Sequence, residues 1–305
     1  MNRQLEELLD ELGAGFHSET PAPYDLRALC RSTGQVPTEL VELPTRTQVH
    51  LLEGREAHPV TAPAAPVAGV VDGVQPPARA MAWHDGRPVA LLYAAAGCLN
   101  PGTSRIETLE ERLLLVASHL DGAWTRDISH GIPVVELAER YPAEIVGAIR
   151  ELHWRLRHRL ERLVLAAVRR PGALVVADGH IRDVAPGDGP VAGVVKSSQS
   201  QYLTDERELI AMAAGNLSKA FRLPALRDGE LDRYSAYLRL HPAVEAPWTH
   251  GLVRLETNEL EALDGLASWC LESRQGPGTD RRWPVHLQPV ATCEWALRAR
   301  VPPIL

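Results

Sequence analysis

The stretch VAGVVDG at residues 67–73 decides the fold class that we predict for this chain. Small and branched apolar residues run up to Asp72 and Gly73, which is the pattern of a short buried strand that ends at a turn. The pattern returns at residues 173–179, ALVVADG, where a second apolar run ends at Asp178 and Gly179. The sequence therefore predicts two buried strands, far apart in the chain, that each end in an Asp-Gly pair.

Further strands are predicted around these two. Residues 78–83 and 88–95 are apolar runs separated by an Asp-Gly hairpin signal, so that residues 67–95 should form an antiparallel meander of three strands. Additional strands are predicted at residues 191–195, 235–240 and 251–256.

Helices are predicted between and after the two Asp-Gly strands. Residues 106–120 carry apolar side chains at intervals of three and four, and Ser104 with Glu107 forms a possible capping box. A longer helix should begin near Pro142, carry an apolar stripe, and stop at Pro171-Gly172. Shorter helices are predicted at residues 4–12, 205–221 and 287–299.

Composition indicates a globular protein and gives no sign of a membrane segment or a leader. The 305 residues are 45% hydrophobic and 23% charged, and the formal net charge is −7, so no bulk attraction to phosphate is expected. None of the four cysteines lies in a CxxC pair, which favours free thiols. We expect a soluble, cytoplasmic protein.

The order of the predicted elements is that of a ribonuclease H-like core. Three antiparallel strands, a helix and then a strand ending in Asp place Asp72 and Asp178 on neighbouring strands of a mixed sheet flanked by helices. Carboxylates brought this close repel one another unless a cation neutralises them, and oxygen ligands suit Mg²⁺ or Mn²⁺. We expect residues 1–60 to form an N-terminal helical or irregular extension, and residues 61–305 to form the domain that carries the site.

Three segments resemble the NurA family of DNA-end-processing nucleases. They are GVVDGVQ at residues 69–75, LVVADGHI at 174–181 and VAGVVKSSQSQYL at 191–203, of which the last is the most specific. The resemblance implies a metal-dependent deoxyribonuclease in which Asp72 and Asp178 bind Mn²⁺ or Mg²⁺. Lys196 would contact the scissile phosphate or stabilise developing charge.

The family also has an acid on the helix that leads into the second Asp strand. Glu161 occupies a suitable position in this chain, so the resemblance implies that Glu161 is a third catalytic and metal-binding residue. Glu151 and Glu111 are the alternatives.

The C-terminal region departs from the family pattern. An Ala-His pair is expected on the last helix, but Ala291 or Thr292 stands where the His would align, and His286 and Glu294 are the candidates to replace it. Val74 replaces the Ser that usually follows the first Asp-Gly pair. A binding module with an eroded metal site therefore remains an alternative to an active nuclease.

The long helix offers a local basic surface for DNA. Its arginines include Arg155, Arg159 and Arg162, whose side chains can make bidentate contacts to phosphate. The family resemblance further implies a homodimer and a partner, a hexameric HerA-like ATPase that drives DNA into the nuclease. A ribonuclease H-like enzyme acting on RNA or on branched junctions is the third alternative.

Overall fold

The computed structural model describes most of the chain after residue 44. The described residues are 45–46, 49–53, 55–84, 87–118, 132–138, 141–181, 189–196, 200–202, 206–223, 232–242, 249–276 and 285–302. The helix predicted at residues 4–12 lies outside this part of the chain.

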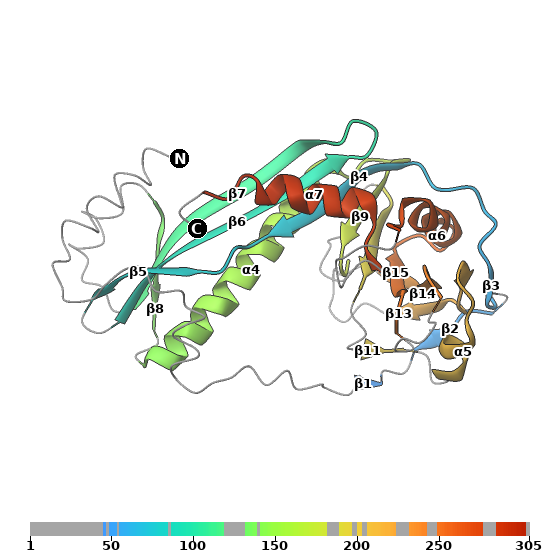
Figure 1. Ribbon diagram of the computed structural model, residues 1–305, viewed down its shortest axis with the longest axis horizontal. Helices are drawn as coiled ribbons and strands as arrows, with labels where there is room; N and C mark the ends of the chain where they lie inside the picture. Colours follow the sequence, from blue (N-terminus) through green and yellow to red (C-terminus); the bar gives the residue numbers. More distant parts are fainter. Residues whose placement is uncertain are drawn as a thin grey trace.

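One large mixed sheet forms the centre of the molecule (Figure 1). Its path runs β2-β13-β14-β15-β10-β9-β4-β6-β7-β8, and three short strands pair off this path. The strands on the path are β2 (His50–Leu51), β13 (Phe221–Leu223), β14 (Arg233–Arg239), β15 (Leu252–Thr257), β10 (Val191–Val195), β9 (Leu174–Asp178), β4 (Val67–Val74), β6 (Arg87–Asn100), β7 (Arg105–Ser118) and β8 (Val134–Leu137).

The centre of the sheet has the order expected for a ribonuclease H-like core. Strands β4, β6 and β7 pair antiparallel in turn, while β9 pairs parallel to β4 and β10 pairs parallel to β9. The helix α4 (Pro142–Val168) comes between the third strand of this core and β9. The predicted fold class, a mixed sheet flanked by helices, is confirmed by this topology.

The strands of the predicted meander are assigned differently in the structure. Strands β4 and β5 (Arg79–His84) both pair with β6, along different lengths of it, so together they occupy one position in the sheet. The third position belongs to β7, where we predicted a helix at residues 106–120. That prediction is wrong, because pairing with β6 along most of its length holds these residues extended.

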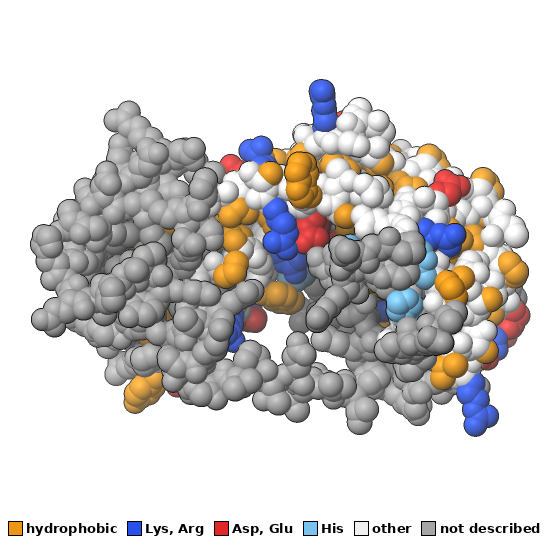
Figure 2. All heavy atoms as spheres, viewed as in Figure 1, with side chains coloured by type: hydrophobic (Ala, Val, Ile, Leu, Met, Phe, Trp, Pro, Cys, Tyr) orange, Lys and Arg blue, Asp and Glu red, His pale blue; other side chains and the backbone are white. Residues whose placement is uncertain are grey.

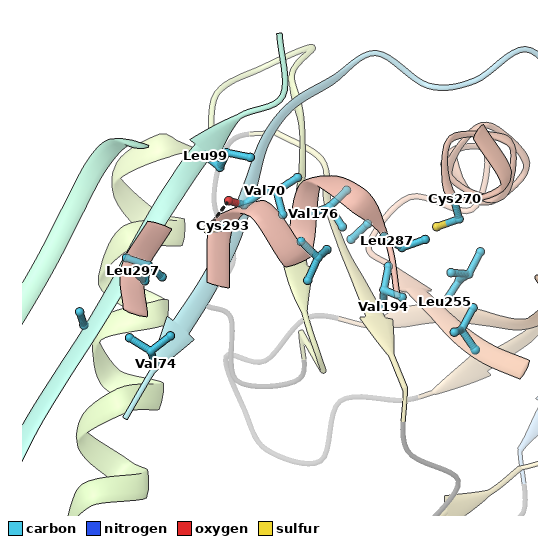
Figure 3. Packing of buried hydrophobic residues seen from close by; sticks show 14 of the residues in the cluster. Val70, Val74, Leu99, Val176, Val194, Leu255, Cys270, Leu287, Cys293 and Leu297 are labelled. Atoms are coloured by element: carbon cyan, nitrogen blue, oxygen red, sulfur yellow. Dashed lines mark hydrogen bonds between the residues drawn. The ribbon is translucent and has the colours of Figure 1, made fainter. Parts of the chain in front are cut away.

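Two helical layers cover opposite faces of the sheet. On one face, α4 packs its apolar stripe over β4, β6 and β9, where Leu160 and Val164 contact Val71 and Val175. On the other face, α7 (Gln288–Arg298) lies across β4 and β6 and buries its apolar side over the strands (Figure 3). The helix α6 (Ala262–Ser273) covers β14 and β15 on the same side as α7.

The remaining elements are short. The predicted helix at residues 205–221 is wrong over most of its length, because only α5 (Glu206–Ala211) is helical and two strands follow it. No helix in the described residues is long and apolar enough to cross a membrane. The other strands are β1 (Thr45–Arg46), β3 (His58–Pro59), β11 (Ser200–Gln201) and β12 (Asn216–Leu217). The described cysteines, Cys98, Cys270 and Cys293, are free and buried, as predicted.

Candidate active site

The structure places Asp72 and Asp178 on neighbouring parallel strands. The register of β4 and β9 pairs Val71 with Ala177, so the next position on each strand brings Asp72 opposite Asp178. Adjacent strands of a sheet lie about 4.8 Å apart, and side chains at opposed positions project from the same face. The two carboxylates are therefore close neighbours at the carboxyl ends of the two central strands.

Strand alternation directs both carboxylates toward the face that α7 covers. Asp72 lies between Val70 and Val74, which pack in the same core as Cys293 and Leu297 of α7 (Figure 3). Figure 2 shows acidic and basic side chains side by side near the middle of the view. The packing of Val70 and Val74 places Asp72 where α7 meets the end of β4.

Asp72 is held in a nearly dry environment. Its exposed fraction is 4%, and its Oδ1 accepts a hydrogen bond of 2.7 Å from the backbone N–H of Gly73. Burial, followed by the negative charge of Asp178, raises the pKa of the Asp72 carboxyl well above its ordinary value. Burial, followed by the negative charge of Asp72, also raises the pKa of the Cys293 thiol on α7.

Asp178 is paired with Lys196. The Lys196 ammonium lies 2.8 Å from both carboxylate oxygens of Asp178, and each side chain is about four-fifths buried. The pairing follows from the register of β9 and β10, which sets Asp178 opposite Val194, so that Lys196 lies two residues further along the same face. The lysine thus neutralises one carboxylate of the pair.

Glu161 approaches β4 from the opposite face. It lies on α4 against Gly73, where an added Cβ would overlap with the Glu161 side chain, so a larger residue at this position would displace Glu161. The Glu161 carboxylate is held by His158 at 2.8 Å and by Arg157 at 3.3 Å. Gly73 and Asp72 are successive residues of β4 and therefore face opposite sides of the sheet. Glu161 lies on the side that Gly73 faces, and the Asp72 side chain projects from the other side.

The alternative helix acids lie elsewhere. Glu151 is on α4 but half-exposed, with Arg155 at 2.6 Å as its ion-pair partner. Glu111 is on the strand β7, so it is no helix acid, and it accepts a hydrogen bond of 3.1 Å from the Tyr93 hydroxyl. Of the three candidates, Glu161 is therefore the one whose position contributes to the electrostatics of Asp72.

The donor set fits a divalent cation held by two carboxylates. Asp72 and Asp178 offer only oxygen atoms, and a cation between them would relieve the repulsion that raises the pKa of Asp72. Mg²⁺ commonly uses one or two carboxylates and completes its shell with water and phosphate oxygens. Among the described residues, no three His, Cys, Asp or Glu side chains lie close enough together to hold a metal. A third ligand from Glu161 would therefore require its carboxylate to leave His158 and Arg157.

The proposed DNA-contacting arginines share one exposed stripe of α4. Arg155, Arg159 and Arg162 follow one another at intervals of four and three residues, which places them on one side of the helix. Arg155 is ion-paired with Glu151, although its side chain remains 71% exposed.

At the C-terminus, the structure locates the two residues considered as substitutes for the missing His. His286 is buried just before α7, and Glu294 lies on α7 beside Cys293, with Arg298 at 2.7 Å. Val74 ends β4 and is buried in the core under α7, which gives it a packing role.

A second charged cluster lies behind Asp178 and was not predicted from the sequence. His180 follows the Asp178-Gly179 turn, and its Nδ1 lies 3.0 Å from the buried carboxylate of Glu256. Arg233 and Arg254 contact the same carboxylate at 3.1 and 3.0 Å. Alternation along β15 was the available signal, because the charged residues Arg254 and Glu256 occupy alternate positions of a largely apolar strand and therefore share one face.

Comparison with known proteins gives structural likeness without a sequence relationship. No protein-family model matches the chain, and a search of curated proteins finds no match either. Among solved structures, the catalytic domain of human endonuclease V aligns at 15% identity with a TM-score of 0.35, covering 92% of this chain and 97% of that chain. The NurA nuclease from Sulfolobus solfataricus aligns at 10% identity with a TM-score of 0.36, covering 97% and 92%.

Both of these similar proteins are nucleases by name. TM-scores this low do not define a fold, so the fold class rests on the strand order, and the site rests on its own geometry. Membership of the NurA family stays a prediction from the three sequence segments.

Proposed function

We propose that this chain is a metal-dependent nuclease that hydrolyses phosphodiester bonds of DNA. The observation that carries the proposal is the register of β4 and β9, which sets the buried Asp72 beside Asp178. A buried carboxylate next to a second carboxylate is costly unless a cation or a proton neutralises it. A pair of this kind at the ends of central strands is a candidate functional site rather than a structural ion pair.

Asp72 and Asp178 would hold Mn²⁺ or Mg²⁺, and Glu161 of α4 would join them as a third ligand by leaving His158 and Arg157. Bound there, a divalent ion would supply Lewis-acid stabilisation of a phosphate oxygen and a water of lowered pKa. The Asp72 carboxylate, buried and fixed by the Gly73 N–H, keeps a constant orientation toward Asp178. The covering helix α7 limits the access of water to Asp72, which strengthens every charge interaction at this end of the sheet.

Lys196 is the electrostatic helper in this proposal. Its ammonium lies at the carboxylate of Asp178, on the face of the sheet that carries Asp72. A phosphate bound at the cation between the two carboxylates would meet this positive charge, which would stabilise negative charge as it develops on the phosphate oxygens. Lys196 therefore combines a structural contact with a position suited to the reaction.

The wider assembly follows from the resemblance to NurA. DNA would run along α4, where Arg155, Arg159 and Arg162 supply the local positive charge that the whole chain lacks. The same resemblance supports a homodimer and a hexameric HerA-like ATPase that delivers DNA to the site.

A non-catalytic DNA-binding or ATPase-docking module is the second candidate. One observation favours it: the described residues contain no cluster of three potential metal ligands. In this reading Lys196 permanently neutralises Asp178, and the same fold clamps DNA without cutting it.

Titration of Mn²⁺ against thermal stability separates the two candidates. A ligand that binds the folded state stabilises it by about 2.7 kcal/mol at a concentration about 100 times its dissociation constant. We expect Mn²⁺ to raise the melting temperature of the wild type, and Asp178→Ala and Asp72→Ala to remove this rise. Glu151→Ala, which changes an exposed acid of α4, is the matched control and should keep the full rise. The same melting temperature with Mn²⁺ and with EDTA would favour the binding module.

A cleavage assay then identifies the reaction. We expect Mn²⁺-dependent cleavage of DNA by the wild type and none by Asp72→Ala, with Glu151→Ala cleaving normally. Comparing single-stranded DNA, duplex DNA and RNA tests the remaining alternative, because preferred cleavage of RNA would point to a different ribonuclease H-like enzyme. Equal cleavage by the wild type and Asp72→Ala would remove the proposed mechanism.

A further inference from the structure

An exposed tryptophan on α4 is linked by side-chain contacts to the candidate site. Trp154 is 42% exposed, and its ring lies edge-on to the ring of His158, with 4.2 Å between their centroids. His158 in turn holds Glu161 at 2.8 Å, and Glu161 packs against Gly73, the neighbour of Asp72. Positions 154, 158 and 161 lie on one side of the helix, since they are spaced by four and three residues.

The surroundings of Trp154 are positively charged. The helix carries five arginines and three glutamates, in a chain whose net charge is −7. Arg150 and Arg155 flank Trp154 on the solvent side, and both are exposed. A half-exposed indole among arginines, in contact with His158, is suited to a ligand that has both a flat apolar surface and negative charge.

We infer that Trp154 is a stacking platform for an unpaired base of a single-stranded nucleic acid. The inference rests on the proposed function and adds the strandedness of the substrate to it. The arginines of α4 would contact the phosphates while the base stacks on the exposed part of the indole. Bases of an intact duplex are already stacked on one another, so this contact selects for single strands.

The spacing along the helix fits a strand that runs from Trp154 to Glu161, which packs against Gly73 near the end of β4. Seven residues separate Trp154 from Glu161, which corresponds to about 10 Å at the rise of an α-helix. A strand with a base on Trp154 could therefore place a phosphate a short distance away at the end of β4. The negative charge of such a strand complements the arginines of α4, which a purely apolar partner would leave without a counter-charge.

The chain offers a matched control in Trp295. This residue lies on α7, on the other face of the sheet, and is 73% exposed. The two arginines that follow it are both ion-paired, Arg298 with Glu294 at 2.7 Å and Arg300 with Glu111 at 3.6 Å. Trp295→Ala therefore tests the effect of removing any exposed indole, and Trp154→Ala tests the effect of removing the proposed platform.

The experiment measures binding of labelled oligo(dT) and of a blunt duplex by fluorescence anisotropy, in EDTA and at low salt. We expect Trp154→Ala to weaken binding of oligo(dT) by about five-fold or more, the loss that removal of one base–aromatic stack gives. Binding of the duplex should change by less than about two-fold, because its phosphate contacts remain. Trp154→Phe should restore most of the oligo(dT) affinity, and Trp295→Ala should bind like the wild type.

Several results would overturn the inference. They are wild-type affinity of Trp154→Ala for oligo(dT), an equal loss on the duplex, or the absence of any oligo(dT) binding by the wild type. Conversion of a dimer to a monomer by Trp154→Ala, with oligo(dT) affinity unchanged, would also overturn it and would assign this face to a second copy of the chain.

The metal titration is independent of this test. If Trp154→Ala loses oligo(dT) affinity selectively but Mn²⁺ fails to stabilise the wild type, the nuclease proposal fails and the stacking platform stands. If Mn²⁺ stabilises the wild type and Trp154→Ala binds oligo(dT) normally, only the platform fails.

Discussion

Two buried carboxylates, Glu256 and Asp72, lie in the same sheet, and their surroundings shift the pKa in opposite directions. Glu256 on β15 is fully buried, yet its pKa is lowered to about 2, because His180, Arg254 and Arg233 together outweigh the effect of burial. Asp72 on β4 is almost equally buried, but its pKa is raised by burial and by Asp178. Glu256 has His180, Arg233 and Arg254 in contact with its carboxylate, whereas Asp72 has a second carboxylate beside it and only the charge of Lys196, which is paired with Asp178, to offset its own.

The difference separates a structural role from a candidate functional one. A buried ion that receives several hydrogen bonds and opposite charges contributes to a defined packing of its strands. A buried carboxylate beside a second carboxylate is instead poised to take up a cation or a proton. The comparison therefore gives Glu256 a structural role beside the Asp178-Gly179 turn, through its contact with His180, and leaves Asp72 as the candidate functional carboxylate.

The largest expected effect is the loss of stability in Glu256→Gln. The substitution leaves Arg233 and Arg254 buried without a counter-charge, which costs about 3–5 kcal/mol of unfolding free energy. Urea denaturation of the wild type and the variant measures the difference. Glu151→Gln, which breaks an exposed pair with Arg155, is the control and should cost less than about 1 kcal/mol. Similar losses in both variants would contradict the contrast between the two centres.

The next largest effect is the loss of unfolding free energy at acidic pH. The pKa of Glu256 is lower in the folded chain than its ordinary value of 4.5, so its contribution is complete above about pH 4.5 and is lost as the pH falls toward 2. A shift of this size corresponds to about 3 kcal/mol. Unfolding free energies at pH 6 to 3 should therefore fall more steeply for the wild type than for Glu256→Gln. Parallel pH profiles would show that Glu256 has no depressed pKa.

A smaller effect, of the opposite kind, is expected at the first centre. In EDTA, Asp72→Asn removes a buried charge while keeping the shape of the side chain, so its stability should equal or exceed that of the wild type. We expect a difference of no more than about 1 kcal/mol. A loss as large as that of Glu256→Gln would mean that Asp72 is a structural ion with partners of its own.

The central strands and the long helix were predictable because local pattern and tertiary structure agree there. The apolar runs that end at Asp72 and Asp178 are buried strands, and the apolar stripe after Pro142 forms the helix α4. The order of these elements was sufficient to predict that the two aspartates lie on neighbouring strands. Lys196 was proposed through the resemblance of residues 191–203 to NurA, and the structure places its ammonium 2.8 Å from the Asp178 carboxylate.

The strand β7 could not be recognised in this way. Its first part, with Glu107, Glu110 and Glu111, favours helix by composition, and its last residues are buried on both faces, which removes the alternation typical of a strand. Long pairing with β6 overrides the local preference. Capping and spacing signals between Ser104 and Leu120 were therefore misleading, and Glu111 was misassigned to a helix.

The second acidic centre could not be predicted because its members meet only in the folded sheet. Arg233, Glu256 and His180 come from β14, β15 and the turn after β9, and their pairing depends on the strand order. No motif of the sequence brings these residues together. The contact of Glu161 with Gly73 depends in the same way on the packing of α4 over β4.

The most direct test is a crystal structure of the wild-type chain with Mn²⁺, analysed by anomalous diffraction. We expect a manganese peak between the carboxylates of Asp72 and Asp178, with oxygen ligands from both at about 2.2 Å, and no such peak in crystals of Asp178→Ala. Carboxylates that diverge into different layers, or manganese bound only at other residues, would contradict the proposed site.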